Sequence, residues 1–197
     1  MRYLALGDSY TIGELVPLEK NFPHQTVTVL KGKNINLQLD KTIAVTGWTT
    51  GELNEAIAKE KPTQDYDWVT LLIGVNNQYR GQEIERYEKE LYNLISQSIL
   101  FAKGRASRVI ILSIPDWGMT PFNTKRDITQ VSKEIDEYNT IKKKWAEHFG
   151  CPYLDITPLT RKFSKNEDYL TEDKLHLTGK MYRLWAERIA RIIIDNS

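Results

Sequence analysis

Short apolar runs rich in β-branched residues alternate along the chain with longer stretches in which apolar side chains recur at helical spacing. This alternation is typical of a parallel β-sheet that helices cover on both faces. The sequence therefore predicts the α/β class, as a three-layer α/β/α sandwich with a mostly parallel central sheet of about five strands. The expected strands are residues 3–6, 42–45, 68–73, 109–114 and 153–156.

Three stretches show a clear helical period: residues 82–103, residues 128–149 and the segment after Thr178. Each has one apolar face, which we expect to pack against the sheet. No internal repeat and no linker rich in proline, glycine or serine interrupts the pattern. We therefore expect residues 1–197 to form a single domain.

The charge of the chain is balanced, with 27 Lys and Arg against 26 Asp and Glu. This gives no basis for expecting a nucleic acid or an anionic membrane as a partner, and we interpret the charged runs as solvent-exposed faces. No apolar run is long enough to span a bilayer. Because the first residues already have the character of a core strand, we expect a cytoplasmic protein without integral membrane association. The one cysteine, Cys151, is expected to serve in packing.

A serine follows the first expected strand in the motif Gly7-Asp8-Ser9. Ligands and catalytic groups gather at the carboxyl edge of parallel sheets, where this serine would lie. Far along the chain, Asp173 and His176 have a spacing that brings two side chains to the same side of a helical turn. A serine hydroxyl becomes an effective nucleophile when an imidazole accepts its proton and a carboxylate orients that imidazole. These three residues are therefore candidates for nucleophilic catalysis.

Two more motifs follow expected strands at the same edge of the sheet. Thr46-Gly47-Trp48-Thr49 comes after the second strand, and Gly74-Val75-Asn76-Asn77 comes after the third. Together with Gly-Asp-Ser and the Asp-x-x-His pair, and in this order, these motifs resemble those of the SGNH hydrolases, also called GDSL lipases and esterases. The resemblance covers essentially the whole chain. It implies the flavodoxin-like fold of that family.

The resemblance implies a role for each motif residue. Ser9 would be the nucleophile, His176 the general base and Asp173 the residue that orients His176. The oxyanion hole would consist of the backbone N–H groups of Ser9 and Gly47 and the side-chain amide of Asn76, since fixed donors lower the barrier of acyl transfer without reorganising. The implied activity is hydrolysis of carboxylic esters through an acyl-enzyme, on small or short-chain esters such as acetylated sugars or lysophospholipids. No cofactor is implied.

The loops around these motifs supply candidate substrate contacts. The family commonly has Asp where this chain has Asn77, a departure that affects the support of the loop more than the chemistry. The other candidates either contact substrate or only fix a loop and cap the edge of the sheet. The full set of candidates is Trp48, Asn77, Tyr79, Arg80, Trp117, Met119 and Phe122.

Two other kinds of function stay open from the sequence. A glycine-flanked serine after a first strand also occurs in loops that bind phosphate, although residues 7–13 lack the lysine of a P-loop and the glycine pattern of a dinucleotide fold. The second alternative is a non-catalytic domain that binds esters or glycans. His24 and His148 are expected to be structural or solvated, and no histidine or cysteine spacing predicts a metal site.

Overall fold

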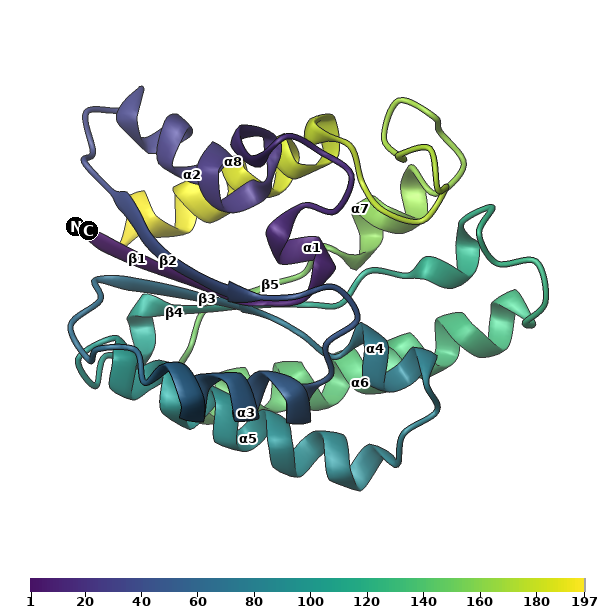
Figure 1. Cartoon of the computed structure of the whole chain (residues 1–197), viewed down its shortest axis with the longest axis horizontal. Coiled ribbons are helices and arrows are strands. Elements are labelled where there is room, and N and C mark those ends of the chain that lie inside the picture. The colour runs from purple at the N-terminus through teal and green to yellow at the C-terminus, as the bar shows by residue number, and fades with distance from the viewer. Residues whose placement is uncertain (197) are drawn as a thin grey trace.

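Five parallel strands form the centre of the computed structural model, which describes residues 1–196 (Figure 1). Their order across the sheet is β2-β1-β3-β4-β5, and every neighbouring pair is parallel. The predicted α/β class and parallel sheet are confirmed. The strands are β1 (Arg2–Gly7), β2 (Gln38–Ala44), β3 (Trp68–Leu72), β4 (Val109–Leu112) and β5 (Tyr153–Leu154).

Helices cover the sheet on both faces, which gives the three layers expected from the sequence (Figure 1). One face is covered by α2 (Phe22–Lys31) and α8 (Gly179–Asp195), which pack against each other. The other face is covered by α3 (Thr50–Glu60), α5 (Ile84–Phe101) and α6 (Ile128–Phe149).

Three short helices follow strands at the carboxyl edge of the sheet: α1 (Ser9–Ile12) after β1, α4 (Val75–Tyr79) after β3 and α7 (Thr157–Lys162) after β5. Short 3-10 turns occupy Leu18–Lys20, Ala106–Arg108 and Trp117–Met119. The candidate motifs therefore meet at one edge, because parallel strands all end on the same side.

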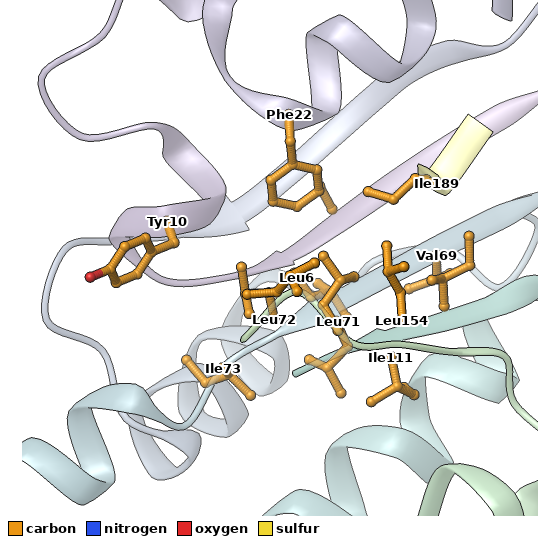
Figure 2. Close-up of a cluster of buried hydrophobic side chains, with 14 of the residues drawn as sticks. Leu6, Tyr10, Phe22, Val69, Leu71, Leu72, Ile73, Ile111, Leu154 and Ile189 are labelled. Atoms are coloured by element: carbon orange, nitrogen blue, oxygen red, sulfur yellow. The ribbon is translucent and has the colours of Figure 1, made fainter. Parts of the chain in front are cut away.

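The core lies on both faces of the sheet, and the inner strands are fully buried. Strands covered on both sides have continuous apolar sequences, and for this reason the sequence predicts β3 and β4. Figure 2 shows Phe22 of α2 and Ile189 of α8 facing the side chains of Leu6 and Leu71. The free Cys151 is buried before β5, and burial raises the pKa of its thiol to about 12.

The edge strands depart from their predicted bounds. β2 begins at Gln38 and its first residues alternate between exposed and half-buried side chains, so they lack the apolar run that marks an inner strand. β5 has only two residues, Tyr153 and Leu154. An edge strand has one neighbour only, and its length follows from pairing with that neighbour rather than from its own apolar pattern.

Candidate active site

Ser9 begins α1 directly beyond the end of β1. The turn that carries it is tight, because a Cβ on Gly7 would collide with the carbonyl oxygen of Leu72 on β3 and with the side chain of Thr11. The Asp8 carboxylate caps α1 by accepting the Tyr10 N–H at 3.0 Å. Glycine thus lets β1 approach β3 closely, and the cap directs Ser9 to the edge of the sheet.

His176 lies between Ser9 and Asp173. Its Nε2 is 2.9 Å from the Ser9 hydroxyl, and its Nδ1 is 2.6 Å from a carboxylate oxygen of Asp173. Because an ionised carboxylate only accepts hydrogen bonds, Nδ1 carries the proton and Nε2 accepts from the Ser9 hydroxyl. The Tyr10 ring packs against the imidazole with 5.2 Å between ring centroids. The structure therefore brings together three residues that the sequence separates by up to 167 positions.

Asp173 is held in a turn rather than on a helix. Its second carboxylate oxygen accepts the N–H groups of Leu175 and His176, both at 2.9 Å, and the Thr171 hydroxyl at 2.7 Å. Lys174 has a φ of 59°, which the helical spacing argument did not anticipate. Partial burial acts to raise the pKa of Asp173, but the hydrogen bonds from His176 and its neighbours outweigh burial and hold the pKa at about 2. The carboxylate is therefore ionised beside the imidazole.

Gly47 and Asn76 approach Ser9 from the loops after β2 and β3. Gly47 has a φ of 84°, a conformation that side-chain-bearing residues rarely adopt. The Asn76 amide nitrogen donates to the Trp48 carbonyl at 3.0 Å, which ties the two loops together. A primary amide has two N–H donors, so one remains for a ligand. Gly47, Asn76, Ser9 and His176 all line one cavity.

Arg80 lies outside the lining of this cavity and supports the Gly47 loop from behind. Its guanidinium donates to the Gly47 carbonyl at 2.5 Å and forms an ion pair with Glu52 at 3.3 Å. Glu52 in turn completes the capping box with Thr49 at the start of α3. The contacts of Arg80 are therefore those of a residue that fixes a loop.

Three other substrate-contact candidates also lie outside the cavity lining in the described chain. Asn77 is fully buried. Its side-chain oxygen Oδ1 accepts the Thr50 N–H at 3.0 Å, and its side-chain nitrogen Nδ2 donates to the Gln82 side chain at 2.9 Å. Trp48 packs partly buried against the core, and Met119 is half-buried at the end of its 3-10 turn. Asn77 occupies the place of the expected carboxylate and supports the loop internally.

The cavity has a volume of about 170 Å³ and is walled on one side by aromatic rings. We call the set Tyr79, Trp117 and Phe122 the aromatic ridge. The Trp117 ring lies 5.0 Å from Tyr79 and 6.2 Å from Phe122, measured between centroids. The rest of the lining is Tyr10, Thr46, Val75 and Leu175. The ridge thus contains the three substrate-contact candidates that line the same cavity as Ser9.

The ridge is fixed from behind by a network that the sequence did not reveal. The Trp117 indole N–H donates to Gln78 at 2.7 Å, and the Gln78 amide donates to Glu134 of α6 at 2.6 Å. Arg126 pairs with Glu134 at 2.9 Å and lies 5.5 Å from the Trp117 ring centroid. On its outer side the ridge borders a second hollow of about 460 Å³, completed by residues 123–126.

Comparison with known proteins decides the family. A model of the GDSL-like lipase/acylhydrolase family matches residues 5–184. The chain belongs to this family. It is accordingly a carboxylic ester hydrolase, and the resemblance stated from the motifs is confirmed. A search of curated protein sequences found no significant match to this hydrolase.

Solved structures share the fold of the hydrolase at low sequence identity. The esterase EstA from Pseudoalteromonas sp. is 15% identical over 98% of this chain and 97% of its own, with a TM-score of 0.71. The acetylxylan esterase Axe2 from Geobacillus stearothermophilus is 18% identical over 98% and 93%, with a TM-score of 0.74. A lipase/acylhydrolase from Enterococcus faecalis is 19% identical over 98% and 94%, with a TM-score of 0.75.

A buried charged pair lies beneath the site of the hydrolase. Lys142 of α6 is fully buried, and burial lowers the pKa of its amine to about 7 while the charge of Asp8 acts to raise it. Asp8 is also fully buried, and burial raises the pKa of its carboxyl to about 7 against the opposing effects of the Tyr10 N–H and Lys142. The expectation that charged runs are solvated is wrong for Lys142. A signal was present, since Lys142 continues the apolar stripe of Val131, Ile135 and Tyr138 at helical spacing.

Residues 1–196 bring together no group of three or more His, Cys, Asp or Glu side chains able to hold a metal ion. Of the helices in the described chain, none is long and apolar enough to cross a bilayer.

Proposed function

We propose that this hydrolase cleaves short-chain carboxylic esters with Ser9 as nucleophile, through an acyl-enzyme. The observation that carries the proposal is the line of hydrogen bonds from Ser9 through His176 to Asp173, at 2.9 Å and 2.6 Å. Each ring nitrogen of His176 has the partner that general-base catalysis requires. Ser9 and His176 also line a cavity that is open to a small ligand.

In the acylation step the Ser9 oxygen attacks the carbonyl carbon of the ester, and its proton passes to Nε2 of His176. The carbonyl π electrons move to the oxygen, which forms a tetrahedral oxyanion. When the bond between the carbonyl carbon and the leaving oxygen breaks, His176 returns the proton to that oxygen and an alcohol departs. The ionised Asp173 stabilises the imidazolium while it carries the proton.

The oxyanion would be stabilised by three donors: the N–H groups of Ser9 and Gly47 and the second N–H of Asn76. The Ser9 N–H is the first of α1, and the first N–H groups of a helix have no acceptor within it. Because Asn76 is tied to Trp48 and Gly47 is supported by Arg80, these donors are held in place before the reaction. Fixed donors of this kind each contribute about 10²- to 10³-fold to kcat.

In the deacylation step a water molecule takes the place of the departed alcohol. His176 accepts a proton from the water, whose oxygen attacks the acyl carbon. A second tetrahedral oxyanion forms at the same three donors and collapses. The carboxylic acid leaves, and the proton returns to the Ser9 oxygen.

The size of the cavity supports a small acyl group. A volume of about 170 Å³ walled by apolar side chains suits a short chain, and the hollow of about 460 Å³ beyond the aromatic ridge suits the leaving alcohol. Axe2, which shares the fold, is by name an acetylxylan esterase. We therefore propose acetyl and other short acyl esters with a bulky alcohol as substrates.

The proposal is tested with a p-nitrophenyl ethylphosphonate probe, whose p-nitrophenolate leaves as the Ser9 oxygen bonds to phosphorus, because EstA, which shares the fold, is inhibited by monoethylphosphonate. The wild type should be phosphonylated stoichiometrically at Ser9, as located by peptide mass spectrometry, and should hydrolyse p-nitrophenyl acetate. Ser9→Ala should lose labelling and lower kcat by roughly 10⁴-fold or more while the fold is retained. Ser107→Ala changes an exposed serine and is the matched control, expected to behave as the wild type.

Two results would reject the mechanism. One is labelling of the wild type at another serine, and the other is full turnover by Ser9→Ala. A wild type that binds esters but neither reacts with the probe nor turns over would favour the alternative of a non-catalytic binding domain.

A further inference from the structure

A lysine that takes no part in the serine chemistry is anchored beneath the site. The Lys142 ammonium is fully buried and donates to the Ile73 carbonyl at 2.6 Å and to the Leu112 carbonyl at 2.9 Å. Leu112 is the last residue of β4, and Ile73 directly follows β3. One side chain from α6 thus reaches the carboxyl ends of two neighbouring strands. An amine buried this deeply is costly unless hydrogen bonds and an opposite charge compensate it.

Asp8 supplies the opposite charge. It is fully buried, and one carboxylate oxygen accepts the Tyr10 N–H. The other oxygen has no hydrogen-bond partner among residues 1–196. The charges of Asp8 and Lys142 act on each other, since each shifts the pKa of the other toward the ionised form. The lysine is therefore the compensation for a carboxylate that sits directly before Ser9.

Asp8 and the Ile73 carbonyl that Lys142 binds lie at the bases of the two turns that carry the reacting groups. Asp8 precedes Ser9, and Ile73 lies three residues before Asn76. The strands below these turns are in direct register, because Gly7 of β1 pairs with Leu72 of β3. Lys142 therefore fixes the end of β3 at the edge where Ser9 must face the Asn76 amide.

We propose that Lys142 is a positioning residue for ester hydrolysis, which holds the carboxyl end of β3, and with it the Asn76 turn, against the Ser9 turn of β1 through its hydrogen bond to the Ile73 carbonyl. The inference rests on the proposed function, because it acts through Ser9 and Asn76. Nucleophile and oxyanion donors must be aligned in the transition state, and a displacement of about 1 Å from a distant change costs up to about 10²-fold in rate.

The test compares Lys142→Met with the matched control Lys143→Met, which changes the next residue on the exposed face of α6. Methionine is unbranched and only one atom shorter than lysine, and it removes the charge and the donors. We expect Lys142→Met to lower kcat for p-nitrophenyl acetate about 10- to 100-fold, with KM within about twofold of the wild type. The rate of phosphonylation at Ser9 should fall in parallel. Lys143→Met should match the wild type in all three quantities.

A second substitution tests the role of Asp8. In Lys142→Met the Asp8 carboxylate loses its counter-charge, so adding Asp8→Asn should raise kcat at least about threefold above that of Lys142→Met alone. A merely structural role for Lys142 would lower the free energy of unfolding of Lys142→Met without lowering kcat at constant KM. Circular dichroism and urea unfolding establish that each variant is folded before its kinetics are compared.

Two results would overturn the proposal: a folded Lys142→Met with kcat within about twofold of the wild type, or a loss that appears in KM instead. If Lys142→Met does not fold, the double variant decides. A folded double variant with reduced kcat and unchanged KM supports the proposal, and one with wild-type kcat overturns it. A wild type that is inert to both ester and phosphonate would reject the proposed function itself, a result separate from any difference among variants.

Discussion

The cavity has two sides that are built differently. Its floor, formed by Ser9, Gly47, Asn76 and His176, consists of groups fixed by hydrogen bonds, and the Ser9 and His176 side chains are buried. On the aromatic ridge only Trp117 is buried and hydrogen bonded, while Tyr79 and Phe122 are 49% and 38% exposed. The rings contact one another through faces and edges, which allow adjustment that a hydrogen-bond line does not.

This difference indicates a division of labour within the proposed function. Groups fixed around the reacting atoms act in the transition state and should affect kcat. Exposed rings contact the substrate away from the reacting atoms. They bind the ground state and the transition state equally and should affect KM. Substitutions on the floor should therefore change kcat, and substitutions on the ridge should change KM. Each of the following experiments tests this difference.

The largest effect after the loss of Ser9 is expected from Asp173→Asn, with kcat lowered about 10³- to 10⁴-fold, because an amide no longer holds the required tautomer or stabilises the imidazolium. A pH profile of kcat distinguishes this role. The pKa of Asp173 is held at about 2, below the ordinary value of about 3.9. Its carboxylate therefore stays ionised at higher pH, and the effect of its negative charge is lost only as the pH falls toward 2.

The ionised carboxylate is therefore present in the wild type at every pH well above 2 and absent from Asp173→Asn at every pH. The ratio of wild-type to variant kcat should accordingly stay high across the neutral range and fall only as the pH approaches 2. A ratio near one at neutral pH would remove Asp173 from its proposed role.

Asn76→Ala should lower kcat about 10²- to 10³-fold with little change in KM, as expected for an oxyanion donor. The neighbouring Asn77→Ala is the control. It removes buried hydrogen bonds to Thr50 and Gln82 and should instead lower the free energy of unfolding, by about 1–3 kcal/mol in urea titrations. An exchange of these two effects would show that Asn77 and not Asn76 is the donor.

On the ridge, Phe122→Ala should raise KM up to about tenfold for an acetyl ester of a bulky alcohol. The substitution removes an exposed ring whose apolar contact with the alcohol contributes about 1.5 kcal/mol or less to the binding free energy. For ethyl acetate, whose alcohol is too short to cross the ridge, KM should change little. The measurement is a pair of Michaelis–Menten curves for the two esters. A fall in kcat for both esters would place Phe122 with the floor.

The smallest effect is expected from Arg80→Ala. Its ion pair with Glu52 is exposed, and exposed pairs contribute about 0.2–1 kcal/mol, so kcat should fall no more than about fivefold through loosening of the Gly47 loop. Added salt should weaken the wild type toward the variant, because exposed charges are screened. A rise in KM that depends on the alcohol would instead make Arg80 a substrate contact.

The sequence predicted the inner part of the fold well and its edges less well. β3 and β4 are buried on both faces and therefore appear as apolar runs, whereas the first half of β2 alternates between exposed and half-buried side chains and was not predicted as strand. Lys142 shows the reverse error. It stands in a run of three lysines that reads as a solvated face, yet its position in the apolar stripe of α6 was the better guide.

For the site, the motifs indicated which residues meet, because parallel strands bring their following loops to one edge. They did not indicate which of the candidate side chains lie outside the lining of the cavity. Arg80 and Asn77 find partners on α3 and in neighbouring loops, and these contacts exist only in the folded chain. The network of Gln78, Glu134 and Arg126 behind Trp117 joins α4 to α6 and has no local signature.

The hydrogen bond between Ser9 and His176 closes a loop of 167 residues, and all five strands end before His176 is reached. A ribosome therefore synthesises all five strands before it adds the residue that we propose as the base of Ser9. Contacts of such long range form late, since the entropy of closing the loop must first be offset by the packed sheet. In the proposed mechanism Ser9 therefore has no base while the sheet is synthesised, and the order of the chain delays activity until the carboxyl-terminal segment docks.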